Sequence, residues 1–389
     1  MPKSLPAEGA SVLIAAISGR ALAAAARRAG LTPLVADFFA DADTGRMAHS
    51  CRKFDSPLKH GMRWASLDPA LEALAREAPS PVLGLIYGSG FEDRVELLAK
   101  LAERWPLLGN GPREVERVKA PESFFAELAS LGVSHPRTVI DPPLAGKGWL
   151  TKRRGGAGGS HVAVAGQPQT PTLSDRSYFQ EEVEGRPVSA LFVGDGARAR
   201  VLGFSQQWTA PTRASSWRYG GAVRPAELFS ELELRMTEAV ERVACAFQLK
   251  GLGSADFLVG EGRDGAAFLL EINPRPGATL DIFDSDDEPL LGLHLDAVLS
   301  HRLPEGPLRL QGASSAAIVY ASEPFMVSAE MIWPDWAADQ PGCGDWIDKN
   351  RPICTVLARA ETGVTARRLV EDRIGMILAE CGGNQGGTQ

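Results

Sequence analysis

Short apolar runs alternate with helical patterns over the first hundred residues. Strands are predicted at 12–17, 33–36 and 82–87, and amphipathic helices at 21–29, 69–77 and 91–104. Continuous apolar strands that alternate with helices predict βαβ units, in which a parallel sheet is covered on both faces. The turns Ser18-Gly19-Arg20 and Gly88-Ser89-Gly90 each follow one of these strands. In an open α/β sheet such turns lie at the carboxyl edge, where ligands bind.

After about residue 109 the pattern changes to short β segments between longer helices. Helices are predicted at 120–131, 226–248, 290–300 and 364–380, and strands at 136–140, 149–152, 161–165, 178–182, 188–193, 201–204, 254–259, 266–273, 316–321 and 353–358. This change predicts a first domain at 1–110, a second at 111–300, and a β-rich C-terminal portion at 301–389 that a helix closes.

The chain has 389 residues and a formal net charge of −7. An acidic balance argues against a nucleic acid or an anionic membrane as the main partner. The apolar run at 12–26 is interrupted by Ser18-Gly19-Arg20, and no stretch reaches the roughly 18 uninterrupted apolar residues of a membrane span. We therefore expect a cytoplasmic protein with no membrane partner. Five scattered cysteines without CxxC spacing argue against a disulfide framework or a zinc site.

A glycine-rich segment lies between the two strands predicted at 149–152 and 161–165. Its glycines, whose backbone N–H groups could close over phosphates at a hairpin tip, are Gly155, Gly156, Gly158 and Gly159. Lys152 would place an ammonium on the α- and β-phosphates, Ser160 offers another donor, and His161 would shape the loop. The lysine precedes the glycines and no GK[ST] follows, so this is not a Walker A loop. The alternative is an exposed hairpin that binds nothing.

Two neighbouring predicted strands carry acidic side chains among apolar ones. Glu271 and Asn273 are two residues apart and therefore share a face of their strand. A hairpin turn centred at 263–264 would place Asp256 directly opposite Glu271. Facing carboxylates destabilise a sheet unless something neutralises them. Asp, Glu and Asn oxygens are ligands that Mg²⁺ takes beside nucleotide phosphates. These strands therefore predict a metal site, the alternative being a solvated polar face.

Arg275 follows the second acidic strand between two prolines. A guanidinium fixed beside a metal–phosphate centre can stabilise a transferring phosphoryl group or an acyl phosphate. The alternative is a surface arginine in a Pro-Gly loop. Candidate substrate residues lie in a Ser/Thr/Gly-rich stretch and in the turn after the third predicted strand: Arg213, Arg218, Gly88, Ser89 and Glu92.

Taken in order along the chain, these features, which end in an ExNxR motif from Glu271 to Arg275, resemble the ATP-grasp superfamily. The resemblance spans nearly the whole chain and is strongest from Leu108 to Thr279. The resemblance implies a mixed α/β and α+β ATP-grasp fold. A Rossmann-like pre-ATP-grasp domain would occupy 1–110. The ATP-grasp domain would occupy 111–300, with a lid at about 136–185, and the β-rich portion would follow.

The resemblance also implies roles for single residues. Lys119 falls where the family places its first phosphate lysine, and Lys152 matches the second. Backbone groups of the hinge would bind adenine, at Glu181, Glu182, Val183 and Glu184. Asp256, Glu271 and Asn273 match the ligands of two Mg²⁺ ions, and Arg275 matches the catalytic arginine beside them. Pro187-Val188 stand where many relatives place an acid near the ribose, which leaves the ribose contacts unassigned.

Within the superfamily, the chain most resembles the predicted ATP-dependent carboligase group, distantly similar to biotin carboxylase. In methylotrophic bacteria that group accompanies genes for tetrahydromethanopterin-linked one-carbon metabolism. The resemblance implies a ligase that uses ATP and Mg²⁺ to join a carboxylate to an amine through an acyl phosphate, in biosynthesis of a carrier cofactor such as tetrahydromethanopterin or methylofuran. Open alternatives are a carboxylase, a small-molecule kinase and a non-catalytic nucleotide-binding subunit. A homodimer is usual for the superfamily.

Overall fold

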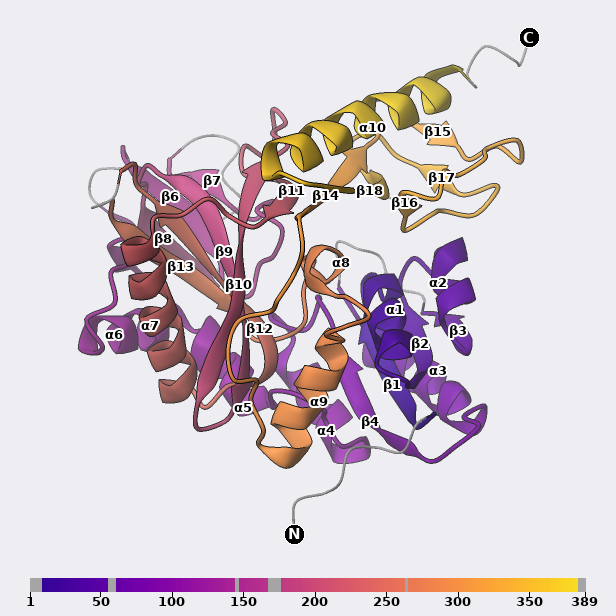
Figure 1. Ribbon diagram of the computed structural model, residues 1–389, viewed down its shortest axis with the longest axis horizontal. Coiled ribbons are helices and arrows are strands. Elements are labelled where there is room, and N and C mark those ends of the chain that lie inside the picture. Colours follow the sequence, from indigo (N-terminus) through magenta and orange to yellow (C-terminus); the bar gives the residue numbers. More distant parts are fainter. Residues whose placement is uncertain (1–8, 55–60, 144–146, 167–175, 263–264, 384–389) are drawn as a thin grey trace.

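The computed structural model describes residues 9–54, 61–143, 147–166, 176–262 and 265–383. The chain opens with a parallel sheet in the order β3-β2-β1-β4. Its strands are β1 (Ser11–Ala16), β2 (Thr32–Asp37), β3 (Ser50–Lys53) and β4 (Val82–Tyr87). The helices between and after them are α1 (Arg20–Arg28), α2 (Ala42–Met47), α3 (Trp64–Arg76), α4 (Val95–Arg104) and α5 (Pro112–Lys119). Figure 1 shows this part in indigo and purple.

Alternate residues of β1 belong to two different hydrophobic cores. Leu13 and Ala15 pack in a core that includes leucines of α3 and α4. Val12 and Ile14 pack with the alanines of α1 and with α9 (Leu290–Ser300). Successive side chains of a strand point to opposite faces, so an almost continuous apolar strand fills both cores. The parallel sheet covered on both faces is thereby confirmed.

A large antiparallel sheet forms the centre of the molecule, in the order β13-β12-β9-β10-β11-β14-β18-β16. Its strands are β9 (Arg186–Asp195), β10 (Ala199–Thr209), β11 (Tyr219–Arg224), β12 (Lys250–Val259), β13 (Ala267–Asn273), β14 (Ala313–Tyr320), β16 (Ala337–Ala338) and β18 (Pro352–Ala360). The helices α6 (Pro121–Ser130) and α7 (Ser230–Ala246) share a core with β9, β10, β12 and β13. The short helix α8 (Leu280–Phe283) and α9 follow β13.

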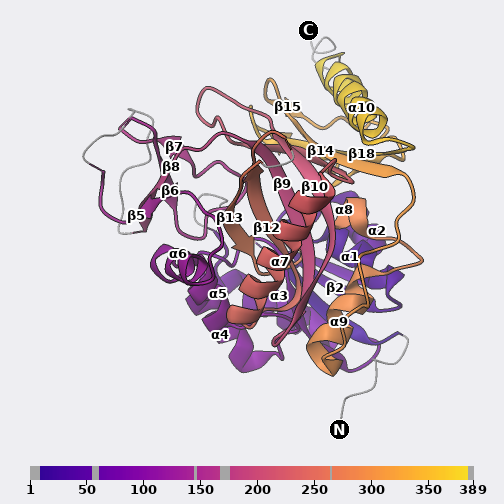
Figure 2. The ribbon, with the colours of Figure 1, turned by 60° about the vertical axis from the view of Figure 1, so that its left-hand side comes forward.

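A small antiparallel sheet stands at one side of the central sheet (Figure 2), in the order β5-β8-β6-β7. It consists of β5 (Thr138–Val139), β6 (Trp149–Arg153), β7 (Ala163–Val164) and β8 (Ser177–Glu181). The predicted hairpin around the glycine-rich loop is confirmed, because β6 and β7 pair antiparallel. The helix α10 (Gly363–Gly383) packs on β14 and β18, and β15 (Phe325–Met326) pairs with β17 (Trp346–Ile347).

The predicted fold class is confirmed, and several elements differ from their predicted limits. The helix predicted at 91–104 begins at Val95, because the residues before it form the turn that carries Glu92. The helix predicted at 226–248 begins at Ser230. The helix α5 lies in a stretch with no predicted element. Strands β14 and β18 continue the central sheet through β11, a pairing that the sequence pattern did not indicate.

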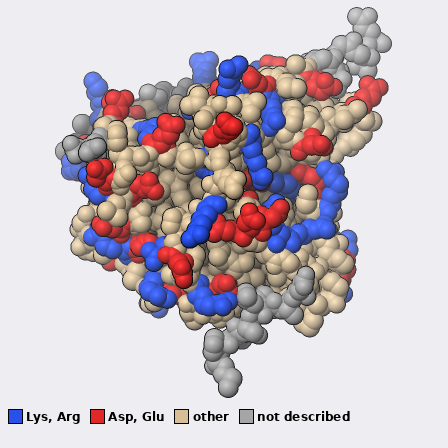
Figure 3. Space-filling view, viewed as in Figure 1, with Lys and Arg blue, Asp and Glu red and all other residues tan. Residues whose placement is uncertain are grey.

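None of the described helices is long and apolar enough to cross a lipid bilayer. Acidic and basic side chains are interspersed over the face of the molecule that Figure 3 shows.

Candidate functional site

A cleft of about 1140 Å³ lies where the parallel sheet, the small sheet and the central sheet meet. Its lining includes the hinge 181–185 and also Ser18, Asp281 and Asp339. Lys152, Asp256, Glu271, Asn273 and Arg275 line the same cleft. The structure therefore brings together most of the residues that the sequence predicted for nucleotide and metal binding. They come from the strand before the glycine-rich loop, from the hinge, and from the two acidic strands with Arg275 after them.

The two acidic strands pair as predicted at their functional end. Asp256 lies opposite Glu271, and Ser254 lies opposite Asn273. Beyond Asp256 the register shifts by one residue, and Leu270 is left without a partner on β12. Such a bulge does not disturb the pairs before it. The predicted turn centre at 263–264 lies outside the described residues.

Hydrogen bonds join the acid pair to a lysine from another element. The Lys119 ammonium donates to Glu271 Oε2 at 3.1 Å and to Asn273 Oδ1 at 2.9 Å. Asn273 Nδ2 donates to Asp256 Oδ2 at 3.0 Å. Ser189, on the neighbouring strand β9, donates to Asp256 Oδ1 at 2.6 Å. Lys119 is the last residue of α5. The C-terminal end of this helix therefore places the ammonium group against the side chains of β13.

The two facing carboxylates have opposite pKa shifts. Burial and the Glu271 charge raise the pKa of Asp256. Burial also acts to raise the pKa of Glu271, but Lys119 and nearby cationic side chains outweigh it and lower that pKa. Because two like charges this close repel each other, one carboxylate holds its charge at the expense of the other. A second cation between the two carboxylates would offset their remaining charge repulsion.

The donor chemistry of these side chains fits a hard divalent cation. Two carboxylates and an amide oxygen meet on one face, and the Lys119 ammonium bridges Glu271 and Asn273 as a cation would. Oxygen donors of this kind suit Mg²⁺, which keeps some of its ligands from water and phosphate. No cluster of three or more His, Cys, Asp or Glu suited to a metal occurs in the described ranges.

Lys152 extends into the cleft from β6. Its ammonium donates to Gln180 Oε1 at 2.6 Å. Burial lowers the pKa of Lys152, although Glu271 and Asp256 act to raise it. The hydrogen-bond partner of this ammonium is thus a neutral amide oxygen, and an anionic phosphate oxygen would make a stronger, charge-assisted hydrogen bond with it.

The glycine-rich loop is packed against other parts of the protein. Gly158 and Gly159 line the cleft, whereas Gly155 and Gly156 pack elsewhere and Ser160 is exposed. The Gly158 carbonyl accepts a hydrogen bond from the backbone N–H of the residue that begins β11.

His161 shapes this loop, as the sequence suggested. Its ring lies against Gly156, where an added Cβ would approach the ring to 2.2 Å. Burial, with smaller effects of Lys152 and Lys119, lowers the pKa of His161 to about 4. The ring is therefore neutral at physiological pH and supplies no charge to the cleft.

The predicted adenine hinge lines the cleft from the last residue of the small-sheet strand β8 onward. The hinge residues Glu181, Glu182, Val183 and Glu184 all line the cleft, and β8 ends at Glu181. The carboxylates of Glu181, Glu182 and Glu184 are exposed. An interaction with adenine would therefore use backbone groups here, as the resemblance implies.

Arg275 and Glu92 form a buried ion pair across 183 residues of sequence. Arg275 Nε donates to Glu92 Oε1 at 2.6 Å. Burial acts to raise the pKa of Glu92, but Arg275 and Lys119 outweigh it and lower that pKa. Glu92 was predicted as a substrate residue, and the structure places it on the arginine instead.

Of the other predicted substrate residues, two line the cleft and two do not. Gly88 and Ser89 line the cleft. Arg213 is exposed and does not line it. Arg218 donates to the backbone carbonyls of Ala210 and Asn350 and lies 3.6 Å from the centroid of the Tyr320 ring. The structure therefore does not bring the two arginines to the cleft.

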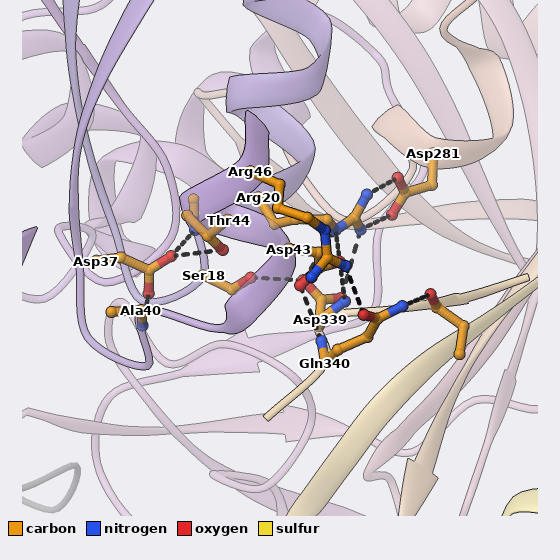
Figure 4. Close-up of polar contacts among 12 residues, drawn as sticks. Ser18, Arg20, Asp37, Ala40, Asp43, Thr44, Arg46, Asp281, Asp339 and Gln340 are labelled. Atoms are coloured by element: carbon orange, nitrogen blue, oxygen red, sulfur yellow. Dashed lines mark hydrogen bonds and ion pairs between the residues drawn. The ribbon is translucent and has the colours of Figure 1, made fainter. Parts of the chain in front are cut away.

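One charged group in the cleft was missed by the sequence analysis (Figure 4). Arg20 donates bidentately to Asp281, at 2.6 and 2.5 Å, and to Asp339 at 3.1 Å. Ser18 also donates to Asp339, and Asp43 lies 3.8 Å from the guanidinium. The turn Ser18-Gly19-Arg20 was the available signal, but its partners lie 261 and 319 residues away.

Comparisons with known proteins agree with this geometry. Residues 123–279 match the family described as ATP-grasp domain. The chain contains an ATP-grasp domain. Its matched segment includes Lys152, the hinge and both acidic strands, and it ends just after Arg275.

Similarity continues outside the ATP-grasp domain. The chain is 23% identical over 265 residues to an uncharacterized protein of Methanocaldococcus jannaschii, and the alignment covers 65% of this chain and 64% of that protein. It is 25% identical over 254 residues to a D-alanine–D-alanine ligase of Oleidesulfovibrio alaskensis, with 61% and 75% covered. The chain thus spans less than two thirds of the archaeal relative.

The fold is similar to that of biotin carboxylase. The structure of the Campylobacter jejuni enzyme in complex with β-γ-ATP superposes with a TM-score of 0.69 and 16% identity, over 92% of this chain and 88% of that one. The parallel sheet, the ATP-grasp domain and the C-terminal strands therefore share one known arrangement.

Proposed function

We propose that the protein is an ATP-dependent carboxylate–amine ligase that produces ADP and works through an acyl phosphate. The observation that carries the proposal is the facing pair Asp256–Glu271 with Asn273, which lines one cleft with Lys152 and Arg275 and accepts hydrogen bonds from Lys119. Phosphoryl transfer needs little covalent chemistry from a protein, because positioning and charge stabilisation supply most of the catalysis. This set provides both.

Each side chain has a role in that reaction. Lys152 and Lys119 hold the phosphates of ATP, and backbone groups at 181–184 bind adenine. Asp256, Glu271 and Asn273 would hold Mg²⁺, which neutralises phosphate charge when bound. Arg275 stabilises charge on the phosphoryl group as it passes to the substrate carboxylate. The tip at 158–159 covers the cleft and limits hydrolysis of the acyl phosphate by water.

The carboxylates around Arg20 support an amine as the nucleophile. Asp281 and Asp339 line the cleft, and their side chains are 13% and 20% exposed. Arg20 balances only one of these two charges, and Asp43 adds a third carboxylate. The surplus is negative, so an ammonium group is favoured there over a carboxylate. The likeness to a D-alanine–D-alanine ligase supports the same class of reaction.

A carboxylase that activates bicarbonate is the second candidate, because the structural likeness to biotin carboxylase covers 92% of the chain. This reading predicts ADP release that depends on bicarbonate and needs an acceptor such as biotin. The ligase reading predicts ADP release that depends on an acid–amine pair.

The pathway is also part of the proposal. The resemblance to carboligases of one-carbon metabolism favours an amide bond in a carrier cofactor such as tetrahydromethanopterin or methylofuran, made by a homodimer with two Mg²⁺ ions at each site. Amino acids and pterin or furan precursors are therefore the substrates to test first.

The test is ADP release from MgATP by the purified chain against a matrix of such acids and amines, with and without bicarbonate. Glu271→Gln serves as the inactive control, and Glu261→Gln, at an exposed position beyond the same strand pair, is the matched control. We expect ADP release with one acid–amine pair and an amide as the product. Glu271→Gln should lose this turnover, whereas Glu261→Gln should keep it. ADP release that needs bicarbonate but no amine would replace the ligase with a carboxylase.

A further inference from the structure

The buried partner of Arg275 comes from outside the ATP-grasp domain. Glu92 lies in the turn between β4 and α4, and it is only 4% exposed. Its Oε2 accepts the backbone N–H groups of Gly90 and Phe91, at 2.9 and 3.1 Å. Its Oε1 accepts Arg275 Nε at 2.6 Å. Three donors thus fix the carboxylate, and the carboxylate fixes the arginine.

The guanidinium is oriented by two of its three nitrogens. Nε bonds Glu92, and Nη1 donates to the carbonyl of Pro276 at 3.3 Å. Within the part of the chain that the structure describes, Nη2 has no hydrogen-bond partner, and Arg275 lines the cleft. The arrangement leaves Nη2 as the donor that a ligand in the cleft can use.

The same turn also contacts the glycine-rich tip. A Cβ added to Gly155 would lie 2.5 Å from the backbone oxygen of Glu92, so the two backbones touch. The turn after β4, the glycine-rich segment and Arg275 therefore meet at a single residue, Glu92, whose backbone lies against Gly155 and whose side chain holds Arg275. Buried ion pairs contribute little net stability, because desolvation offsets their attraction. A stabilising role alone gives no reason for this pair to be ionic.

We propose that Glu92 is a positioning residue, which holds Arg275 with Nη2 directed to the place where the phosphoryl group is transferred. The inference rests on the proposed function, since it assumes a nucleotide in the cleft. It assigns to the parallel sheet a part in catalysis: the N-terminal segment completes the site that the ATP-grasp domain begins.

The test compares Glu92→Gln with Glu96→Gln, an identical change at an exposed residue of α4. The probes are MgADP alone and MgADP with aluminium fluoride, which mimics the transferring phosphoryl group. We expect Glu92→Gln to bind MgADP within about twofold of wild type, and to lose about tenfold or more of the extra affinity that aluminium fluoride gives. This range follows from a hydrogen bond to a charged group. Glu96→Gln should match wild type in both.

A double variant separates positioning from a general structural role. In an Arg275→Met background, Glu92→Gln should change the aluminium fluoride effect by less than about twofold, because Glu92 acts only through the arginine. Equal losses in both backgrounds would overturn the proposal, as would full retention in Glu92→Gln. A parallel loss of MgADP affinity and melting temperature would mean that the residue is structural.

The aluminium fluoride experiment and the turnover test of the proposed ligase can fail independently. A wild-type chain that responds to aluminium fluoride but turns over no acid–amine pair would refute the ligase and leave the role of Glu92 to be decided by its variants. A wild-type chain without MgADP binding, or without the aluminium fluoride response, would overturn the inference itself.

Discussion

Replacing Arg20 by methionine tests the ion-pair cluster that this residue forms in the cleft with Asp281 and Asp339. Arg20 is 6% exposed and forms ion pairs with both Asp281 and Asp339, with Asp43 close by. Methionine keeps much of the side-chain volume but leaves buried carboxylates without a cation. Removing one partner of a buried pair costs about 3–5 kcal/mol, which is a large part of the roughly 5–15 kcal/mol that stabilises a typical domain.

The dependence on pH identifies charge as the cause. In the wild type burial acts to raise the pKa of Asp339, but Arg20 outweighs it and lowers that pKa. The stability that this carboxylate contributes is present above its unfolded pKa and is lost as pH falls through its folded pKa. Without Arg20, burial would raise the pKa of Asp339. The contribution of this carboxyl group to the free energy of unfolding would then be present at low pH and lost as pH rises. The deficit of Arg20→Met should therefore be largest above about pH 6 and should shrink toward about pH 4.

The assay is urea unfolding at several pH values. Arg104→Met is the matched control, because its pairs with Asp68 and Glu72 lie at the surface, with Arg104 37% exposed, and should cost less than about 1 kcal/mol. If Arg20→Met does not fold, Arg20→Lys keeps the charge, loses the bidentate geometry, and should be intermediate. A deficit that is the same at all pH values would refute the charge argument and point to packing. A deficit as small as that of Arg104→Met would refute burial of the cluster.

Three further predictions concern single groups. Burial and neighbouring carboxylates raise the pKa of Asp41 to about 8, so its contribution to stability is present below the unfolded pKa and lost as pH rises through about 8. Asp41→Asn should remove roughly 2 kcal/mol of the decline in unfolding free energy between about pH 6 and pH 9, and an unchanged slope would contradict this. Gly159→Ala should reduce turnover at least about tenfold, because its Cβ would lie 1.7 Å from a backbone oxygen, whereas Gly158→Ala, with a similar positive φ but open space, should lose far less; equal steady-state losses would mean that backbone strain alone matters. Lys152→Met should weaken MgATP binding by about ten- to a hundredfold in calorimetry, while Lys147→Met at an exposed position should not, and a Lys152→Met chain with normal affinity would remove the lysine from the phosphate site.

The sequence determined the local parts of the site. Strand periodicity with the turn between the strands placed Asp256 opposite Glu271, and the pairing holds although the register shifts one residue later. The apolar runs predicted the parallel sheet for the same reason: side-chain alternation is a property of a strand by itself. A glycine-rich segment between two strands likewise predicts a hairpin without knowledge of its surroundings.

Only the tertiary structure decided which distant groups meet. Arg20 and Glu92 look like ordinary charged residues of turns, and their partners Asp339 and Arg275 are 319 and 183 residues away. Arg213 and Arg218 sit in a stretch suited to a substrate loop, yet neither reaches the cleft. Local pattern constrains a residue's face and its near neighbours. Contacts between parts of the chain depend instead on how whole sheets pack, because burial energy is non-directional and the same apolar faces allow several arrangements.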